Sequence, residues 1–231
     1  MSNKIGGAKR KLAKVYDLDF LDGPILEAPR DETAPQQYAW WIRNEQGRDI
    51  LMQECFDYVL DQTKDKQYDA ILGFSQGGLL ATALVSSGRM PGIKAVVTAG
   101  APYVQDVWDF CMAPPPPPPA AAAASVEDTN VDLETAIANG LAVPKLHFAG
   151  ETDGIIPVHC VQSLCDQGGN GELVLHEKGH MFPTKAVSVN KMMEFLKQST
   201  TYDVLEMPAY QARPINEHQF DSHPSNIPAV K

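Results

Sequence analysis

The chain has 231 residues, a length typical of one α/β domain with a substantial core. Its formal net charge is −10, so its surface repels a phosphate backbone on average, and we expect no nucleic-acid partner. Hydrophobic residues make up 44% of the sequence, but no apolar run approaches the roughly 20 residues that cross a bilayer, so we expect no membrane span.

The first 24 residues are predicted to form a helix and then a strand. The start is basic, but no apolar core of a signal peptide follows it, so we interpret residues up to 13 as a short helix with a solvated face rather than a targeting segment. From 15 to 24, the sequence VYDLDFLDGP alternates apolar and acidic residues and stops at Gly-Pro, which is typical of a strand and its terminator.

Further strands and helices alternate along the rest of the chain. Short apolar runs bounded by Gly or Pro predict buried strands at 68–74, 93–100, 144–150 and 171–179. Apolar repeats and a run of small residues predict helices at 52–60, 77–87 and 189–196, with another after Pro157. Because strands that alternate with helices pair in parallel through right-handed crossovers, the sequence predicts an α/β fold, a helix/sheet/helix sandwich.

One domain is expected over residues 1–200, with one irregular insertion and a tail. Residues 112–130 contain six consecutive prolines, which cannot donate hydrogen bonds to a sheet, so we expect an exposed loop. A disordered insertion, a mobile lid over an active site and a ligand of SH3-type domains all fit this composition. Residues 201–231 are polar, rich in Pro and without periodicity, and we expect a loosely attached tail.

The cysteines favour a reducing compartment. They show neither C-x-x-C spacing nor the density of a disulfide scaffold, and they are Cys55, Cys111, Cys160 and Cys165. The last two fall on a predicted helix, where we expect half-buried packing residues rather than a redox pair.

Residues 68–80, YDAILGFSQGGLL, place a serine in a Gly-x-Ser-x-Gly turn between a strand and a helix. A sharp turn of this kind exposes the hydroxyl and points the unpaired N–H groups of the helix N-terminus at an attacked carbonyl. We therefore expect Ser75 to be a nucleophile and the backbone N–H of Gln76 to be an oxyanion donor. The alternative is a capping serine in a purely structural turn.

An acid and a histidine follow at the ends of later strands. Asp153 comes just after the strand at 144–150, and His180 follows the strand at 171–179. Because parallel strands end at one edge of a sheet, we expect both on the rim that holds Ser75. His180 would remove the serine proton, and Asp153 would orient the imidazole. Weaker alternatives are Glu151 as the acid, and Asp166, His159 and His147.

Two other motifs have competing interpretations. HEKGH at 176–180 matches the H-E-x-x-H pattern of zinc proteases, but that pattern needs a helix, whereas His176 ends an alternating strand. The glycines at 73, 77 and 78 lack the G-x-G-x-x-G spacing of a dinucleotide site. We therefore expect no metal and no cofactor.

Four segments together resemble the family of serine hydrolases typified by the fungal serine hydrolases and the ovarian-cancer-associated gene 2 protein, within the α/β-hydrolase superfamily. FLDGP, GFSQGG, GETDGIIP and HEKGHMFP correspond in order to the family's strand-end motif, elbow, acid loop and histidine loop, and the likeness spans about residues 5–198. It implies a three-layer α/β-hydrolase sandwich and a serine esterase or thioesterase for small to medium acyl groups, with Ser75, Asp153 and His180 as the triad. It also implies that no metal is used and that the protein is cytoplasmic, with the nucleus as a second location. Acyl-protein thioesterases share the elbow and are an alternative.

The chain departs from this family at its start. Members begin with a buried strand and a Leu-His-Gly-type loop that supplies one oxyanion N–H, whereas this chain starts at the following helix. We therefore expect an N-terminally truncated fold, in which either the strands around FLDGP and ILGF pair directly or the sequence is incomplete. Removing one oxyanion donor lowers turnover by about 10²- to 10³-fold, so a catalytically impaired protein that binds acyl ligands or partners is an alternative function.

The walls of an acyl pocket are expected from apolar residues near the triad. These are residues 103–112, Ile155, Ile156, Met181 and Phe182. Their character favours a hydrophobic acyl group, carried by a small-molecule ester or thioester substrate.

Overall fold

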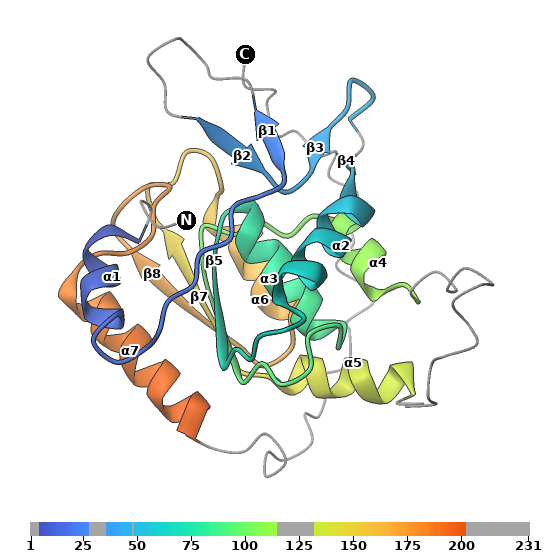
Figure 1. Ribbon diagram of the computed structural model, residues 1–231. Helices are drawn as coiled ribbons and strands as arrows, with labels where there is room; N and C mark the ends of the chain where they lie inside the picture. The colour runs from blue at the N-terminus through green and yellow to red at the C-terminus, as the bar shows by residue number, and fades with distance from the viewer. Residues whose placement is uncertain (1–4, 28–35, 48, 115–131, 202–231) are drawn as a thin grey trace.

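The centre of the molecule is a parallel four-stranded sheet (Figure 1). The computed structural model describes residues 5–27, 36–47, 49–114 and 132–201. The strands are β5 (Ala70–Phe74), β6 (Ala95–Ala99), β7 (Lys145–Gly150) and β8 (Gly171–His176), and they lie side by side in sequence order. These four strand predictions are confirmed. The register pairs Phe74 with Ala99, and Ala99 with Phe148, so the carboxyl ends of the first three strands share one edge.

Helices cover both faces of the sheet. Side chains of a strand alternate between the two faces, and both faces carry buried apolar side chains. Ala95, Val97 and Ala99 of β6 join the core cluster on one face, whereas Val96 packs into the cluster on the other face. The first face is covered by α1 (Gly6–Leu12) and α7 (Ala186–Thr201). The second is covered by α3 (Gln76–Ser86), around which lie α2 (Met52–Thr63), α4 (Gln105–Met112) and α6 (Val158–Gln167). The predicted three-layer α/β sandwich is confirmed.

The predicted helices are confirmed, and two more are present. Ala8 and Leu12 of α1 are buried together with Ile5, which precedes the helix, and the basic residues of α1 are exposed. The segment 105–112 was expected to be a pocket loop, but it is helix α4, whose Val107 and Cys111 pack into the core. Helix α5 (Leu133–Ala142) was not predicted and packs against α3. The predicted Pro/Ala-rich loop beyond residue 114 and the tail beyond residue 201 lie outside the described residues.

The strand prediction for residues 15–24 is wrong. Leu18 and Phe20 do pack against the cluster between the sheet and α7, which explains the alternation, but the segment joins no ladder within the described residues. Its acidic side is held by side chains instead: Asp19 Oδ2 accepts hydrogen bonds from Lys66 Nζ at 2.5 Å and from Tyr68 Oη at 2.7 Å. The alternation of apolar and acidic residues therefore reflects burial of one side of the segment, whereas a strand also needs hydrogen bonds to a neighbouring backbone.

Two short antiparallel hairpins lie beyond the carboxyl end of the sheet (Figure 1). They consist of β1 (Ile25–Glu27) with β2 (Gln37–Ala39), and β3 (Ile42–Arg43) with β4 (Asp49–Ile50). The direct pairing of FLDGP with ILGF does not occur, because residues 20–24 form no strand and β5, which contains ILGF, pairs with β6 alone among the described residues. No helix in the described ranges is long and apolar enough to cross a membrane.

Candidate active site

Ser75 occupies a strained turn between β5 and α3. Its backbone has φ 53° and ψ −124°, a region that residues other than glycine rarely adopt. The Ser75 N–H donates to the carbonyl of Ala99 on the neighbouring strand at 3.0 Å, which fixes the turn to the sheet. The predicted strand-turn-helix setting of the serine is thus present.

Two glycines make this turn possible. A Cβ at Gly73 would lie 2.5 Å from the Gly77 carbonyl oxygen and from the Gly78 Cα. A Cβ at Gly78 would lie 2.6 Å from the Ala101 Cβ. Both distances are far below an ordinary nonbonded contact, so the close packing of α3 against the sheet excludes a side chain at either position.

Unpaired N–H groups lie at the start of α3. The Ser75 carbonyl accepts hydrogen bonds from the N–H groups of Gly78, at 2.9 Å, and Leu79, at 3.3 Å. The N–H groups of Gln76 and Gly77 make no backbone hydrogen bond within the described residues. They therefore remain available to a bound anion or oxyanion, at the electropositive end of the helix.

Asp153 and His180 are joined by a hydrogen bond. His180 Nδ1 lies 2.8 Å from Asp153 Oδ2, and the Asp153 side chain is 1% exposed. The other carboxylate oxygen, Oδ1, accepts the N–H groups of Ile155 and Ile156, both at 2.8 Å. Two backbone donors thus fix the plane of the carboxylate, and the second oxygen fixes the ring of His180.

The imidazole of His180 lies at the end of β5 and β6, beside the turn of Ser75. Its ring centroid is 4.7 Å from that of Phe74, the residue before the serine. A Cβ at Gly100 would lie 2.9 Å from both Nδ1 and Cε1 of the imidazole. Among the hydrogen bonds of the described residues, His180 is bonded to Asp153 and not to Ser75. The structure thus brings the three predicted residues to one edge of the sheet.

The weaker candidates lie elsewhere. Glu151 is exposed, and His159 and Asp166 are exposed on α6. His147 is buried in β7, where its Nδ1 lies 2.8 Å from Thr98 Oγ1, and burial lowers its pKa to about 3. His176 ends strand β8, so the HEKGH segment is not helical.

Several expected pocket residues belong to the core. Phe182 is fully buried in the cluster beneath α7, and Ile156 is 8% exposed. Ile155 and Met181, in contrast, are 61% and 39% exposed. They follow Asp153 and His180 closely in sequence.

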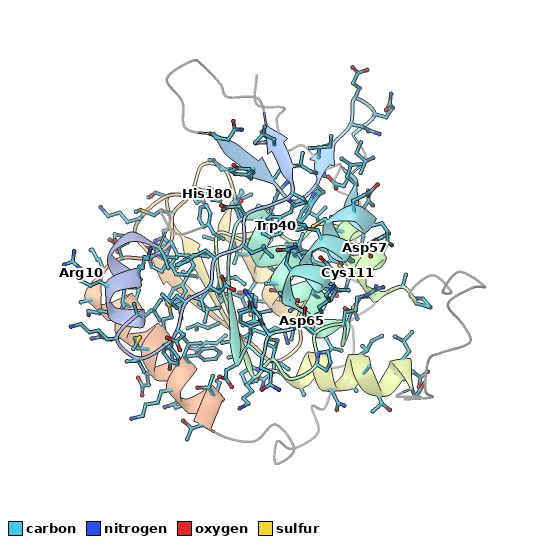
Figure 2. The ribbon with its side chains drawn as sticks, in the orientation of Figure 1. Arg10, Trp40, Asp57, Asp65, Cys111 and His180 are labelled. Atoms are coloured by element: carbon cyan, nitrogen blue, oxygen red, sulfur yellow. The ribbon has the colours of Figure 1, made fainter. Side chains whose placement is uncertain are left out.

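Sequence reasoning missed a segment that lies against the elbow. Gln76 Oε1 accepts the N–H of Trp40, and Gln76 Nε2 donates to the carbonyl of Trp41, both at 3.2 Å. Figure 2 shows Trp40 and His180 on the side of the molecule that carries the hairpins. Residues 25–50 have no clear periodicity, and the pair of adjacent tryptophans was the only signal of this contact.

Comparison with known proteins places the chain in a family. The family model described as Serine hydrolase (FSH1) matches residues 1–192. Esterase OVCA2 of Bos taurus is 26% identical over 224 residues, covering 84% of this chain and 88% of that protein. Family of serine hydrolases 2 of Saccharomyces cerevisiae is 28% identical over 188 residues, covering 79% and 77%. The crystal structure of Zea mays acyl-protein thioesterase 2 aligns with a TM-score of 0.49 and 14% identity, over 72% of this chain and 74% of that one. Because the family model matches most of its length, the chain belongs to the serine hydrolase (FSH1) family.

Proposed function

We propose that this protein hydrolyses carboxylic esters or thioesters of small to medium acyl groups through an acyl-enzyme on Ser75. The main support is the buried Asp153–His180 hydrogen bond, whose imidazole lies beside the strained turn of that serine. Membership in the serine hydrolase family supports the same chemistry. The names of the esterase relatives support an ester as the substrate.

The first half of the reaction forms the acyl-enzyme. Ser75 Oγ attacks the carbonyl carbon while His180 Nε2 takes the hydroxyl proton, and the carbonyl electron pair moves to its oxygen. The N–H of Gln76 donates to this oxyanion. When the oxyanion collapses, the bond to the alcohol or thiol breaks, and His180 returns the proton to that leaving group.

The second half of the reaction releases the carboxylic acid product. A water molecule loses a proton to His180 and attacks the acyl carbon, and the bond to Ser75 Oγ then breaks as the serine regains a proton. Asp153 keeps Nδ1 protonated and Nε2 free to act as the base, because its carboxylate accepts the Nδ1 hydrogen. Its two backbone donors hold it in this orientation without a conformational search.

The substrate side of the site favours an apolar acyl group. Ile155 and Met181 are large, exposed apolar side chains next to the acid and the base. Burying such side chains against a substrate chain contributes roughly 25 cal/mol per Å² of apolar surface. We therefore expect hydrolysis of short-chain nitrophenyl esters and of acyl thioesters, with no added metal or cofactor.

Covalent labelling of Ser75 tests this proposal. The purified protein is treated with a fluorophosphonate, and the adduct is located by peptide mass spectrometry while nitrophenyl acetate hydrolysis is followed in parallel. We expect one adduct, on Ser75, and loss of both adduct and turnover in Ser75→Ala. The matched control is Ser163→Ala, a helix residue on α6 whose hydroxyl donates to the His159 carbonyl, and it keeps both. A folded wild-type protein without labelling, or Ser75→Ala with unchanged turnover, contradicts the proposal and favours a binding module of the same fold.

A further inference from the structure

The geometry points to Trp40 as a second hydrogen-bond donor to the oxyanion, through its indole N–H. This inference rests on the proposed function, because it concerns the oxygen that becomes negative during attack by Ser75. The tryptophan belongs to the segment between β2 and β3, which is more than thirty positions from the elbow in sequence.

The side chain of Gln76 fixes this segment to the elbow. A primary amide presents one acceptor and two donors, and here Oε1 pairs with the N–H of Trp40 while Nε2 pairs with the carbonyl of Trp41. The residue before this segment also packs closely against Gly23, since a Cβ on Gly23 would lie 2.2 Å from the Ala39 carbonyl oxygen. The position of the Trp40 backbone is thus set by the same residue whose own N–H faces the oxyanion.

The indole ring presents its nitrogen edge to the first turn of α3. A Cβ on Gly77 would lie 2.9 Å from Trp40 Nε1, and farther from Cε2 and Cδ1, at 3.6 and 3.7 Å. The nitrogen is therefore the ring atom closest to the position of a Cβ on Gly77. The absence of a side chain at Gly77 leaves the space that the indole edge uses.

The indole N–H has no acceptor in the described part of the chain. Trp40 is only partly buried, and none of the hydrogen bonds among the described residues uses its Nε1. An indole nitrogen can only donate, so it needs an oxygen from solvent or from a ligand. The unpaired N–H groups of Gln76 and Gly77 lie at the same turn, so three donors are available where one substrate oxygen would gain negative charge.

The substitution Trp40→Phe separates this role from that of an apolar wall, because it keeps an aromatic ring and removes the N–H. We expect kcat for ester hydrolysis to fall by about 10²-fold, the usual effect of losing one oxyanion donor, while KM stays close to the wild-type value. The matched control is Trp41→Phe, which removes an indole N–H from a side chain 3% exposed in the core between α2 and α3, and we expect a much smaller loss of kcat. An unchanged kcat in a folded Trp40→Phe overturns the inference.

A spectroscopic measurement on the wild-type protein gives an independent answer. The chain has three tryptophans, so a sample labelled with ¹⁵N at the indoles gives three N–H resonances, which the two Phe variants and Trp108→Phe assign. A fluorophosphonate reacts so that the bond from Ser75 Oγ to phosphorus forms, the bond from phosphorus to fluorine breaks, fluoride leaves and His180 takes the proton. The phosphoryl oxygen then stands in for the oxyanion.

We expect the Trp40 resonance to move downfield on adduct formation, while the Trp108 resonance stays nearly unchanged. If the adduct forms on Ser75 and the Trp40 resonance does not move, the inference fails and the proposed function stands. If no adduct forms on the folded protein, the proposed function fails and this inference fails with it. Because Trp41→Phe and Trp108→Phe assign two of the three resonances and leave the third to Trp40, this measurement decides the question even if Trp40→Phe does not fold.

Discussion

The substitution Gly100→Ala is expected to displace the imidazole of His180. The new Cβ would lie 2.9 Å from Nδ1 and Cε1 of the ring, and an ordinary contact needs about 3.5 Å, so the ring must move by roughly 0.6 Å. The same Cβ would lie 3.5 Å from Asp153 Oδ2, which needs no movement, so the ring moves relative to its acid. A misplacement of about 1 Å in a catalytic group can lower the rate by about 10²-fold, and we expect kcat to fall by about 10- to 100-fold.

This substitution also affects stability, so a control is needed. Gly100 has φ +56°, where an alanine costs about 1 kcal/mol or more of stability. Gly92→Ala is the matched control, because Gly92 has φ +91° and no atom lies within 4 Å of a Cβ placed there. We expect both variants to unfold at lower urea concentration, and only Gly100→Ala to lose turnover and slow its reaction with a fluorophosphonate.

Two results would contradict a role for the contact between position 100 and His180. If folded Gly100→Ala retains the wild-type kcat, either the imidazole does not act as the base in the position described or its displacement does not matter. If Gly92→Ala loses as much turnover as Gly100→Ala, the effect comes from backbone strain and not from the contact with His180. Both outcomes are read from the same pair of urea titrations and steady-state assays.

Three further predictions concern Asp153, the hydrogen bonds of Gln76 to residues 40 and 41, and a buried lysine. Asp153→Asn removes the charge that favours the correct imidazole tautomer, so we expect kcat to fall by about 10³- to 10⁴-fold. Glu151→Gln, at an exposed position, should change kcat little. Equal effects of the two substitutions would contradict the role of Asp153. Gln76→Leu removes two hydrogen bonds, and we expect urea titrations to show a free energy of unfolding lower by about 1 to 2 kcal/mol. The control is Gln162→Leu on α6, which removes one exposed hydrogen bond and should lower the free energy of unfolding by about a few tenths of a kcal/mol. Burial lowers the pKa of Lys145 from 10.5 to about 7. Between pH 7 and pH 10.5 the unfolded chain therefore binds more protons than the folded protein. The free energy of unfolding is then expected to rise with pH, by up to about 1.4 kcal/mol per pH unit. Lys145→Met removes this rise, and an identical pH profile in the variant would show that the lysine is not the cause.

Much of the fold was predictable because its signals are local. The strands of the central sheet are short apolar runs that end at Gly or Pro, and helices α2 and α7 repeat apolar residues every three or four positions. Ser75, Asp153 and His180 each follow a predicted strand, and parallel strands end at one edge, so their common location follows from sequence order. No alignment of distant segments was needed for this prediction.

Other features depended on contacts between segments far apart in sequence. The alternation over 15–24 is real, but whether it forms a ladder depends on a neighbouring backbone, and in the described residues Asp19 is bonded to side chains instead. The distinction between Glu151 and Asp153 also depends on the tertiary structure, because only Asp153 is buried and bonded to His180. Two carboxylates in one loop look alike in sequence, whereas burial and donor geometry separate them.

The sequence by itself determined the order of the four strands of the central sheet and of most of the helices, and the place of Ser75, Asp153 and His180 after strand ends, because periodicity, glycines and prolines act over a few residues. Only the tertiary structure decided that α4 is a core helix, that residues 40 and 41 are hydrogen-bonded to Gln76, and that the indole nitrogen of Trp40 lies closest to Gly77 of α3. These features depend on side-chain and backbone contacts between segments that are far apart in sequence. Such contacts produce no periodic pattern in the sequence, because each one joins a single pair of positions.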